Sequence, residues 1–309
     1  MPKVTVVGAG NVGATCAHSL LRNRLADVVL IDIDEGLAKG KALDLSQAGS
    51  VEGFTNRIIG TADYAETAES DVVVITAGLP RKPGMSRRGL LETNAKIVSD
   101  VVRRALFASP EARILVVTNP MDHMAYLAYR TSELPAERVV GMGGALDTAR
   151  FKYFIASEVG CDPKAIDAMV IGAHSDSMVP LLSLARANGV PLRELVEEEV
   201  ANRIALRTRE GGAEIVSYLK LGSAFYAPGA ATADMVKAIL LDEKRIVPAS
   251  VLGNGAYGIN GIFIGLPVRL GSRGAEEVVE LPIDDLERRA LEKSVKEIEA
   301  GVSAIERAL

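Results

Sequence analysis

The sequence predicts an α/β protein in which a doubly wound parallel sheet is followed by an α+β domain. Short apolar segments alternate with helical patterns from residue 3 to about residue 141, which favours a parallel sheet covered by helices. A glycine-rich turn, GAGNVG at residues 8–13, directly follows the first apolar segment. The alternation ends at GMGG, residues 141–144. Because 309 residues exceed the size of most single domains, we predict two domains, residues 1–142 and residues 143–309.

The first strand, turn and helix predict a dinucleotide site. Residues 3–7 should form a buried strand, and a helical pattern runs from the turn to residue 25. The glycines of GxGxxG allow the backbone to approach a pyrophosphate, and the helix N-terminus offers N–H groups to it. A second strand, residues 28–31, ends at Asp32, whose carboxylate would bind a ribose diol and repel a 2′-phosphate. We therefore expect a Rossmann fold that binds NAD rather than NADP; a glycine-rich turn without a ligand is the alternative. The predicted contacts are Gly8, Gly10, Asn11, Val12, Gly13 and Asp32.

Later strands should bring more residues to the same crevice. We predict strands over residues 57–59, 72–75 and 114–117 and helices over residues 37–45 and 90–107, with a further helix from residue 122. In open α/β sheets, ligands bind outside the carboxyl ends of the strands. Thr76, Ala77 and Gly78 follow one of these strands, beneath the expected cofactor. Asn119 follows another, and the proline after it ends that strand.

A basic loop separates the strand at residues 72–75 from the next helix. Residues 79–88 are rich in proline, glycine and arginine, which is typical of a loop. For Lys82 and Arg88 we favour a solvated surface position. For Arg81 and Arg87 a functional position becomes the better interpretation once the second half of the chain is considered.

One of the three histidines is the best candidate for proton transfer. His174 follows an apolar run and lies among small residues, which leaves room beside the ring. A histidine in such a place is by itself more often structural. His18 should be a packed or partly exposed structural residue, and His123 a surface residue in the first turn of a helix.

Two charged residues precede His174 on a predicted long helix. Asp147 and Arg150 are three positions apart and therefore share one face. They could form only an ion pair within the helix, or they could face the cleft with separate tasks. The order Asp147, Arg150, His174 after a nucleotide-binding half favours the second interpretation.

The whole chain resembles the lactate/malate dehydrogenase family. The matching motifs, in chain order, are GAGNVG at 8–13, Asp32, AGLPRKPGMSR at 77–87, TNP at 118–120, LDTAR at 146–150 and HSDS from His174. The resemblance implies that His174 carries the proton, that Asp147 supports it, and that Arg87 polarises the reacting carbonyl. It also implies that the substrate contacts are Arg81, Arg87, Asn119, Arg150 and Ser223, and that the cofactor contacts include Thr76, Ala77, Gly78, Asn94, Val117 and Asn119. Ser175 departs from the family pattern, which usually has glycine after the histidine.

The residue at position 81 bears on the substrate. In the family, an arginine six positions before the carbonyl-polarising arginine is typical of enzymes that act on malate, and a glutamine of those that act on lactate. The spacing from Arg81 to Arg87 matches. The resemblance thus implies NAD-dependent interconversion of malate and oxaloacetate. The alternatives are an L-lactate dehydrogenase and a non-catalytic NAD-binding redox sensor.

Composition limits the partners. The hydrophobic and charged fractions, 48% and 24%, are those of a globular protein, and the net charge of −5 disfavours binding to nucleic acid or an anionic membrane. We expect no signal peptide, no membrane span and a cytoplasmic protein. Cys16 and Cys161 lack the spacing of a metal site, so no metal is expected.

The resemblance implies a homo-oligomer, a tetramer rather than a dimer. An apolar stripe on the last helix should pack on its own subunit; it consists of Leu291, Val295, Ile298, Val302, Ile305 and Leu309.

Overall fold

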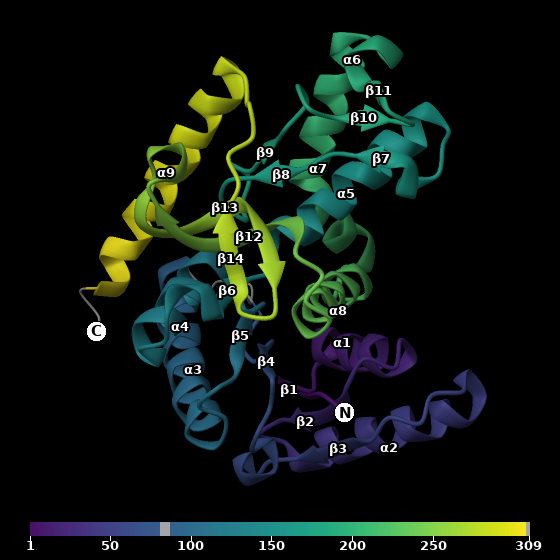
Figure 1. The fold of residues 1–309 in the computed structure, drawn as a ribbon, viewed down its shortest axis with the longest axis vertical. Coiled ribbons are helices and arrows are strands. Elements are labelled where there is room, and N and C mark those ends of the chain that lie inside the picture. The colour runs from purple at the N-terminus through teal and green to yellow at the C-terminus, as the bar shows by residue number, and fades with distance from the viewer. Residues whose placement is uncertain (81–86, 307–309) are drawn as a thin grey trace.

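The computed structural model describes residues 1–80 and 87–306, with only the backbone described at positions 87, 88 and 304. In this part of the chain, nine strands form one sheet in the order β14-β13-β12-β6-β5-β4-β1-β2-β3 (Figure 1). These strands are β1 (Lys3–Val7), β2 (Asp27–Ile31), β3 (Ile58–Thr61), β4 (Val72–Ile75), β5 (Arg113–Val116), β6 (Val139–Gly141), β12 (Arg245–Asn254), β13 (Asn260–Gly271) and β14 (Gly274–Val278).

The first six strands pair in parallel, in the order expected of a Rossmann fold. Their sequences read as continuous apolar runs because helices cover both faces of the sheet, and all four residues of β4 are buried. The strand β12 pairs antiparallel with β6, and β13 and β14 extend the sheet by further antiparallel pairing. The predicted fold class is confirmed.

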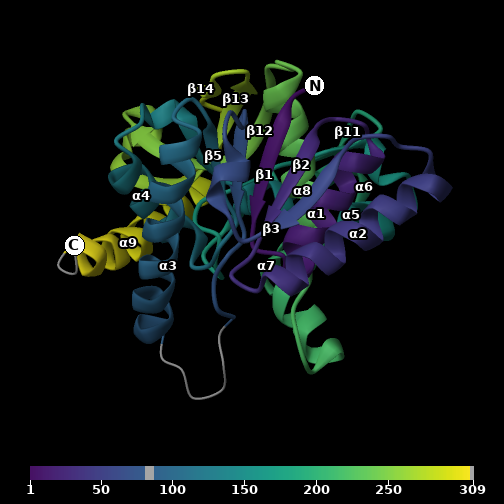
Figure 2. The ribbon, with the colours of Figure 1, turned by 90° about the horizontal axis from the view of Figure 1, so that it is seen from below.

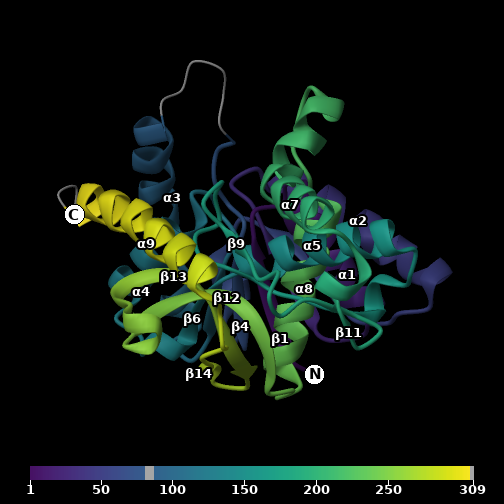
Figure 3. The same ribbon diagram turned by 90° about the horizontal axis from the view of Figure 1, so that it is seen from above.

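Helices cover the sheet on both sides (Figure 2), with α1 and α2 on one face of the parallel strands and α3 and α4 on the other. The helices are α1 (Asn11–Arg22), α2 (Glu35–Glu52), α3 (Arg87–Ala108), α4 (Met121–Ser132), α5 (Gly143–Val159), α6 (Leu192–Leu195), α7 (Glu198–Leu219), α8 (Tyr226–Leu240) and α9 (Asp285–Glu306). Two small sheets complete the second half, formed by β7 (Ile166–Asp167), β8 (Val170–Ile171), β9 (Val179–Pro180), β10 (Arg186–Ala187) and β11 (Val190–Pro191). Figure 3 shows the amino end of α3 and the carboxyl end of α7 projecting on the same side of the molecule.

The helices α7 and α8 contain residues that usually break a helical pattern in a sequence. In α8, Pro228 lies in the first turn, where no intrahelical N–H bond is lost, and Gly229 allows close contact with Thr15 of α1. In α7, Gly211 lies within the helix, where an added Cβ would be 3.2 Å from the Cδ of Arg150. Pro228 is thus tolerated at its position in α8, and the two glycines lie where other elements pack closely.

The prediction that His123 lies at the surface is wrong. Its Nε2 atom is buried without a hydrogen-bond partner in the described residues, and its ring contacts Gly301 of α9. Burial lowers the pKa of His123. The stripe that was predicted on the last helix does pack on its own chain, against α4 and β13, with Leu291, Ile298, Val302 and Ile305 buried. Leu309 lies outside the described residues.

Candidate active site

The turn after β1 has the close packing that its glycines require. Gly8 has a φ of +107°, and a Cβ there would lie 2.6 Å from the Oγ1 of Thr76. A Cβ on Gly13 would collide with the carbonyl of Gly8, whereas one on Gly10 would meet nothing within 4 Å. The turn is therefore tight against β4 and open at Gly10, beside the exposed Asn11 at the start of α1.

Asp32 lies at the end of β2 and already contacts this turn. Its Oδ2 accepts a hydrogen bond of 2.7 Å from the backbone N–H of Ala9, and its Oδ1 accepts one of 3.1 Å from Asp34. The side chain is half-buried. The carboxylate is thus fixed near the turn that was predicted to hold the pyrophosphate. The cradle fits a dinucleotide, and it stays a prediction that Asp32 binds the ribose and the first turn of α1 the phosphates.

The strand ends beneath the predicted cofactor are tied together. The Oγ1 of Thr118 donates to the carbonyl oxygen of Ala77 over 2.7 Å. Asn94, on α3, is buried; its Oδ1 accepts from the N–H of Leu79, and its Nδ2 donates to the carbonyl oxygen of Asn119 over 2.7 Å. Asn94 thus joins the segments that follow β4 and β5, and its contact with the cofactor stays a prediction, like that of Val117.

Three residues predicted from the second half meet in one place. The Nδ1 of His174 lies 2.6 Å from Oδ2 of Asp147, and the Nη1 of Arg150 donates to Oδ1 of the same carboxylate over 3.2 Å. The side chain of Asp147 is 2% exposed, whereas those of His174 and Arg150 are 16% and 14% exposed. One buried carboxylate therefore orients an imidazole and a guanidinium that both reach solvent. Asp147 and Arg150 form the ion pair within the helix, and Asp147 also contacts His174; that the two residues have separate tasks in the cleft stays a prediction.

This arrangement favours the protonated imidazole. Burial lowers the pKa of His174, but the charge and hydrogen bond of Asp147, with the charge of Asp122, raise it. The net pKa lies above the ordinary value of 6.5. The imidazole can therefore donate a proton near neutral pH and accept one back.

Other predicted residues are less well placed by the structure. Arg81 lies outside the described residues, and at Arg87 only the backbone, the start of α3, is described. Asn119 and Ser223 are both exposed, Asn119 after β5 and Ser223 between α7 and α8. Ser175 does not have a positive φ, so its departure from the family's glycine imposes no backbone strain.

Asp122 is a site residue that the sequence did not reveal. It lies in the first turn of α4, only three positions after Asn119, and its carboxylate reaches the backbone of His174. An acidic residue in a first helical turn is common enough that the sequence alone gave no reason to select it.

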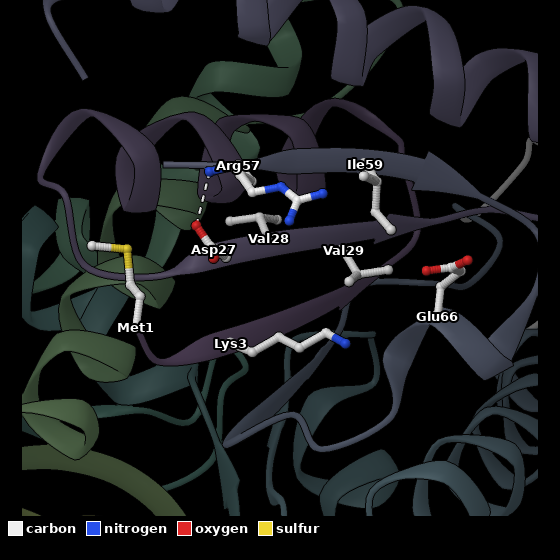
Figure 4. A pocket seen from close by; sticks show the side chains of 8 residues that line it. All are labelled: Met1, Lys3, Asp27, Val28, Val29, Arg57, Ile59 and Glu66. Atoms are coloured by element: carbon white, nitrogen blue, oxygen red, sulfur yellow. Dashed lines mark hydrogen bonds between the residues drawn. The ribbon is translucent and has the colours of Figure 1, made fainter. Parts of the chain in front are cut away.

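Two hollows lie away from these residues. One, of about 300 Å³, is drawn in Figure 4 and includes Lys3, Asp27 and Arg57, near the amino ends of β1, β2 and β3. The other, of about 860 Å³, lies between α6, the start of α7 and the start of α9. The described residues contain no group of three or more side chains suited to a metal ion, and no helix among them is long and apolar enough to cross a membrane.

Comparison with family models places both halves of the chain. Residues 2–141 match lactate/malate dehydrogenase, NAD binding domain, and residues 144–308 match lactate/malate dehydrogenase, alpha/beta C-terminal domain. The chain belongs to the lactate/malate dehydrogenase family. Its amino-terminal half is accordingly an NAD-binding domain, and NAD is its cofactor.

Relatives in this family match along the full length. A malate dehydrogenase of Heliobacterium modesticaldum is 51% identical over 96% of each chain, and one of a Roseiflexus species is 49% identical over 98% of each. The solved structure of malate dehydrogenase from Salinibacter ruber is 43% identical and superposes with a TM-score of 0.95, over 99% of this chain and 98% of that one. Lactate dehydrogenase from Cryptosporidium parvum, solved with lactic acid and NAD, also has a TM-score of 0.95, at 38% identity and with the same coverage.

Proposed function

We propose that this chain catalyses the reversible, NAD-dependent oxidation of (S)-malate to oxaloacetate. The observation that carries the proposal is the contact of 2.6 Å between His174 and the buried Asp147, with Arg150 on the same carboxylate. The relatives at about 50% identity that are named malate dehydrogenase support it. A redox sensor without turnover would not need this acid–base pair.

The residues divide the work of the reaction. Bound NAD supplies the hydride acceptor, and its reduced form the donor. In the direction of oxaloacetate reduction, protonated His174 donates its proton to the oxygen of the ketone as that oxygen gains negative charge. Asp147 keeps the imidazole in one orientation and stabilises its positive charge. In malate oxidation, neutral His174 removes the hydroxyl proton.

Two arginines handle the negative charges of the substrate. Arg150, whose side chain is 14% exposed, is proposed to bind the carboxylate next to the ketone through guanidinium N–H groups that Asp147 does not occupy. The proposed role of Arg87 is to stabilise the developing oxyanion. Asn119 and Ser223 are proposed to line the remaining substrate pocket.

The choice of malate over lactate is proposed to depend on Arg81. Oxaloacetate brings a second carboxylate that can pair with this guanidinium, whereas pyruvate brings only a methyl group. Leaving the charge enclosed and unpaired costs on the order of 3–5 kcal/mol, or a few powers of ten in catalytic efficiency. L-lactate dehydrogenase is the second candidate because a lactate dehydrogenase shares this fold at 38% identity.

The remaining proposals concern cellular context. We propose a cytoplasmic enzyme of the tricarboxylic acid cycle, a location that its two free cysteines support. For the oligomeric state, which is a separate proposal, we propose that the chain forms a homotetramer rather than a dimer. Large apolar side chains that are exposed on α2 and α7 support self-association, among them Leu43, Val51, Leu206 and Tyr218. Light scattering on the purified protein would test this.

One set of assays tests the proposed reaction. NADH oxidation should be much faster with oxaloacetate than with pyruvate, and Arg81→Gln should shift the preference toward pyruvate. His174→Asn should still bind NADH but lose several powers of ten in turnover, and Asp147→Asn should lose less, because its imidazole remains. Similar efficiency with both keto acids would reject the malate assignment, and normal turnover in His174→Asn would reject the acid–base role.

A further inference from the structure

The backbone of the catalytic histidine segment is held from two sides by buried side chains. The N–H of His174 donates to Oδ2 of Asp122 over 2.7 Å. The preceding N–H, that of Ala173, donates to the Oγ of Ser294, also over 2.7 Å. Asp122 comes from α4 and Ser294 from α9, so two helices that are far apart in sequence fix two consecutive peptide groups.

Asp122 is an unusual residue to find at such a contact. It is 4% exposed, and its Oδ1 is buried with no hydrogen-bond partner in the described residues. Ser250 on β12 lies near this carboxyl group, as do the charges of His174 and His123. Burial raises the pKa of Asp122, although Ser250 and the N–H of His174 oppose this. Keeping a carboxyl group here costs free energy that an apolar side chain would not require.

Ser294 makes a similarly specific contact. Its side chain is fully buried, and its Oγ also lies 3.3 Å from the hydroxyl of Ser177. Gly172, with a φ of +86°, passes so close that a Cβ there would be 2.9 Å from this Oγ. The residue that follows β8 thus packs directly against α9.

We propose that Asp122 and Ser294 are positioning residues for proton transfer, because they fix the main chain from which His174 reaches Asp147. The proposal rests on the proposed role of His174 in proton transfer. Asp147 can orient only the imidazole ring of His174. The two backbone contacts fix the position of the main chain from which this side chain extends. A displacement of about 1 Å at a reacting group can cost a factor of about 100 in rate.

Asp122 can carry a charge and Ser294 cannot, so substitutions at the two positions separate an effect on the position of His174 from an effect on its pKa. The charged groups near His174 are Asp147 and Arg150 on α5 and Asp122 on α4, with Glu297 on α9 bonded to the neighbouring Ser175. Asp122→Asn keeps an oxygen that can accept the N–H of His174 but cannot carry a negative charge. Ser294→Ala removes a hydrogen bond and no charge.

The experiment compares Asp122→Asn, Asp122→Ala and Ser294→Ala with two matched controls. Ser109→Ala removes another buried serine whose Oγ accepts a backbone N–H, that of Ser70. Glu287→Gln alters another buried acid that accepts backbone N–H groups, from Ser183 and Asp284. Turnover, KM for oxaloacetate, NADH affinity and melting temperature are measured for each protein. The pKa of His174 is followed by NMR, which is practicable because the chain has only three histidines.

We expect Ser294→Ala and Asp122→Ala to lose about 10- to 100-fold in kcat while KM and NADH affinity stay near those of the parent. Both controls should keep the kcat of the parent even if they melt at lower temperature. Asp122→Asn should recover part of the kcat that Asp122→Ala loses, and its His174 pKa should fall, whereas that pKa should stay unchanged in Ser294→Ala.

Loss of melting temperature with a normal kcat in Asp122→Ala and Ser294→Ala would overturn the proposal, as would an equal loss of kcat in the two controls. A parent protein that is inactive on 2-keto acids would instead reject the proposed function. In that case the NMR measurement still decides, because an unchanged His174 pKa in Asp122→Asn would reject an effect of the Asp122 carboxylate on His174.

Discussion

At the scale of single residues, the protonation state of His174 determines which direction of the proposed reaction it can assist. Its pKa lies above 6.5 because the carboxylates of Asp147 and Asp122 outweigh the effect of burial. Reduction of oxaloacetate needs the protonated ring, so its kcat should fall as pH rises through this pKa. Oxidation of malate needs the neutral ring, so its kcat should fall as pH decreases through the same range. Rates measured in both directions between pH 5 and 10 test this, and parallel profiles would contradict it.

Asp32 permits a second prediction at this scale. Its carboxylate is fixed by the N–H of Ala9 at the end of β2, where a 2′-phosphate would meet it at short range. We expect the parent protein to prefer NADH strongly over NADPH and Asp32→Ser to show a smaller preference. The measurement is the ratio of kcat/KM with NADH to kcat/KM with NADPH in each protein. Equal catalytic efficiency with the two cofactors in the parent protein would show that Asp32 does not discriminate between NADH and NADPH.

At the scale of elements, the sequence predicted what depends on local patterns. The strand at residues 72–75 was predicted at its true bounds, since a run of four β-branched apolar residues is consistent with a buried strand and too short for a typical helix. The glycines of α7 and α8 obscure a helical pattern in the sequence, because they serve close contacts with other elements that no local pattern shows. The burial of His123 and the contact of Asp122 with His174 likewise depend on how α4 packs, which no pattern within α4 reveals.

The close approach of α5 to the histidine segment gives a prediction for an element. A Cβ on Gly143, the first residue of α5, would lie 2.7 Å from the Cβ of His174. Gly143→Ala should therefore displace His174 and lower kcat by about 10-fold or more. Gly40→Ala is the matched control, because Gly40 lies in α2 with nothing within 4 Å of an added Cβ. It should keep the parent's kcat and gain about 0.5–1 kcal/mol in stability, measured by denaturant unfolding. A normal kcat in Gly143→Ala would show that the helix can move aside.

At the scale of the whole molecule, the proposed domain boundary between residues 142 and 143 separates cofactor binding from acid–base chemistry. The large sheet nevertheless contains strands from both sides of this boundary. The family models meet at nearly the same position. However, β6 is bonded to β12 at Gly141 and Ser250, and α1 packs against α8 through Gly229. Catalysis needs the cofactor held by the first half and the acid–base pair of the second, so a rigid connection between the halves suits the proposed chemistry.

We therefore predict that residues 1–142 alone do not form a stable monomer. Removal of the second half would expose Val139 and Val140 of β6, both fully buried in the whole chain, together with the face of α1 that packs on α8. An uncovered apolar edge strand favours association between copies. Circular dichroism during heating and size-exclusion chromatography should show early loss of structure and aggregates. A fragment that stays monomeric and melts near the temperature of the full chain would mean that β12 and α8 add nothing essential to the NAD-binding half, and that the boundary is structural as well as functional.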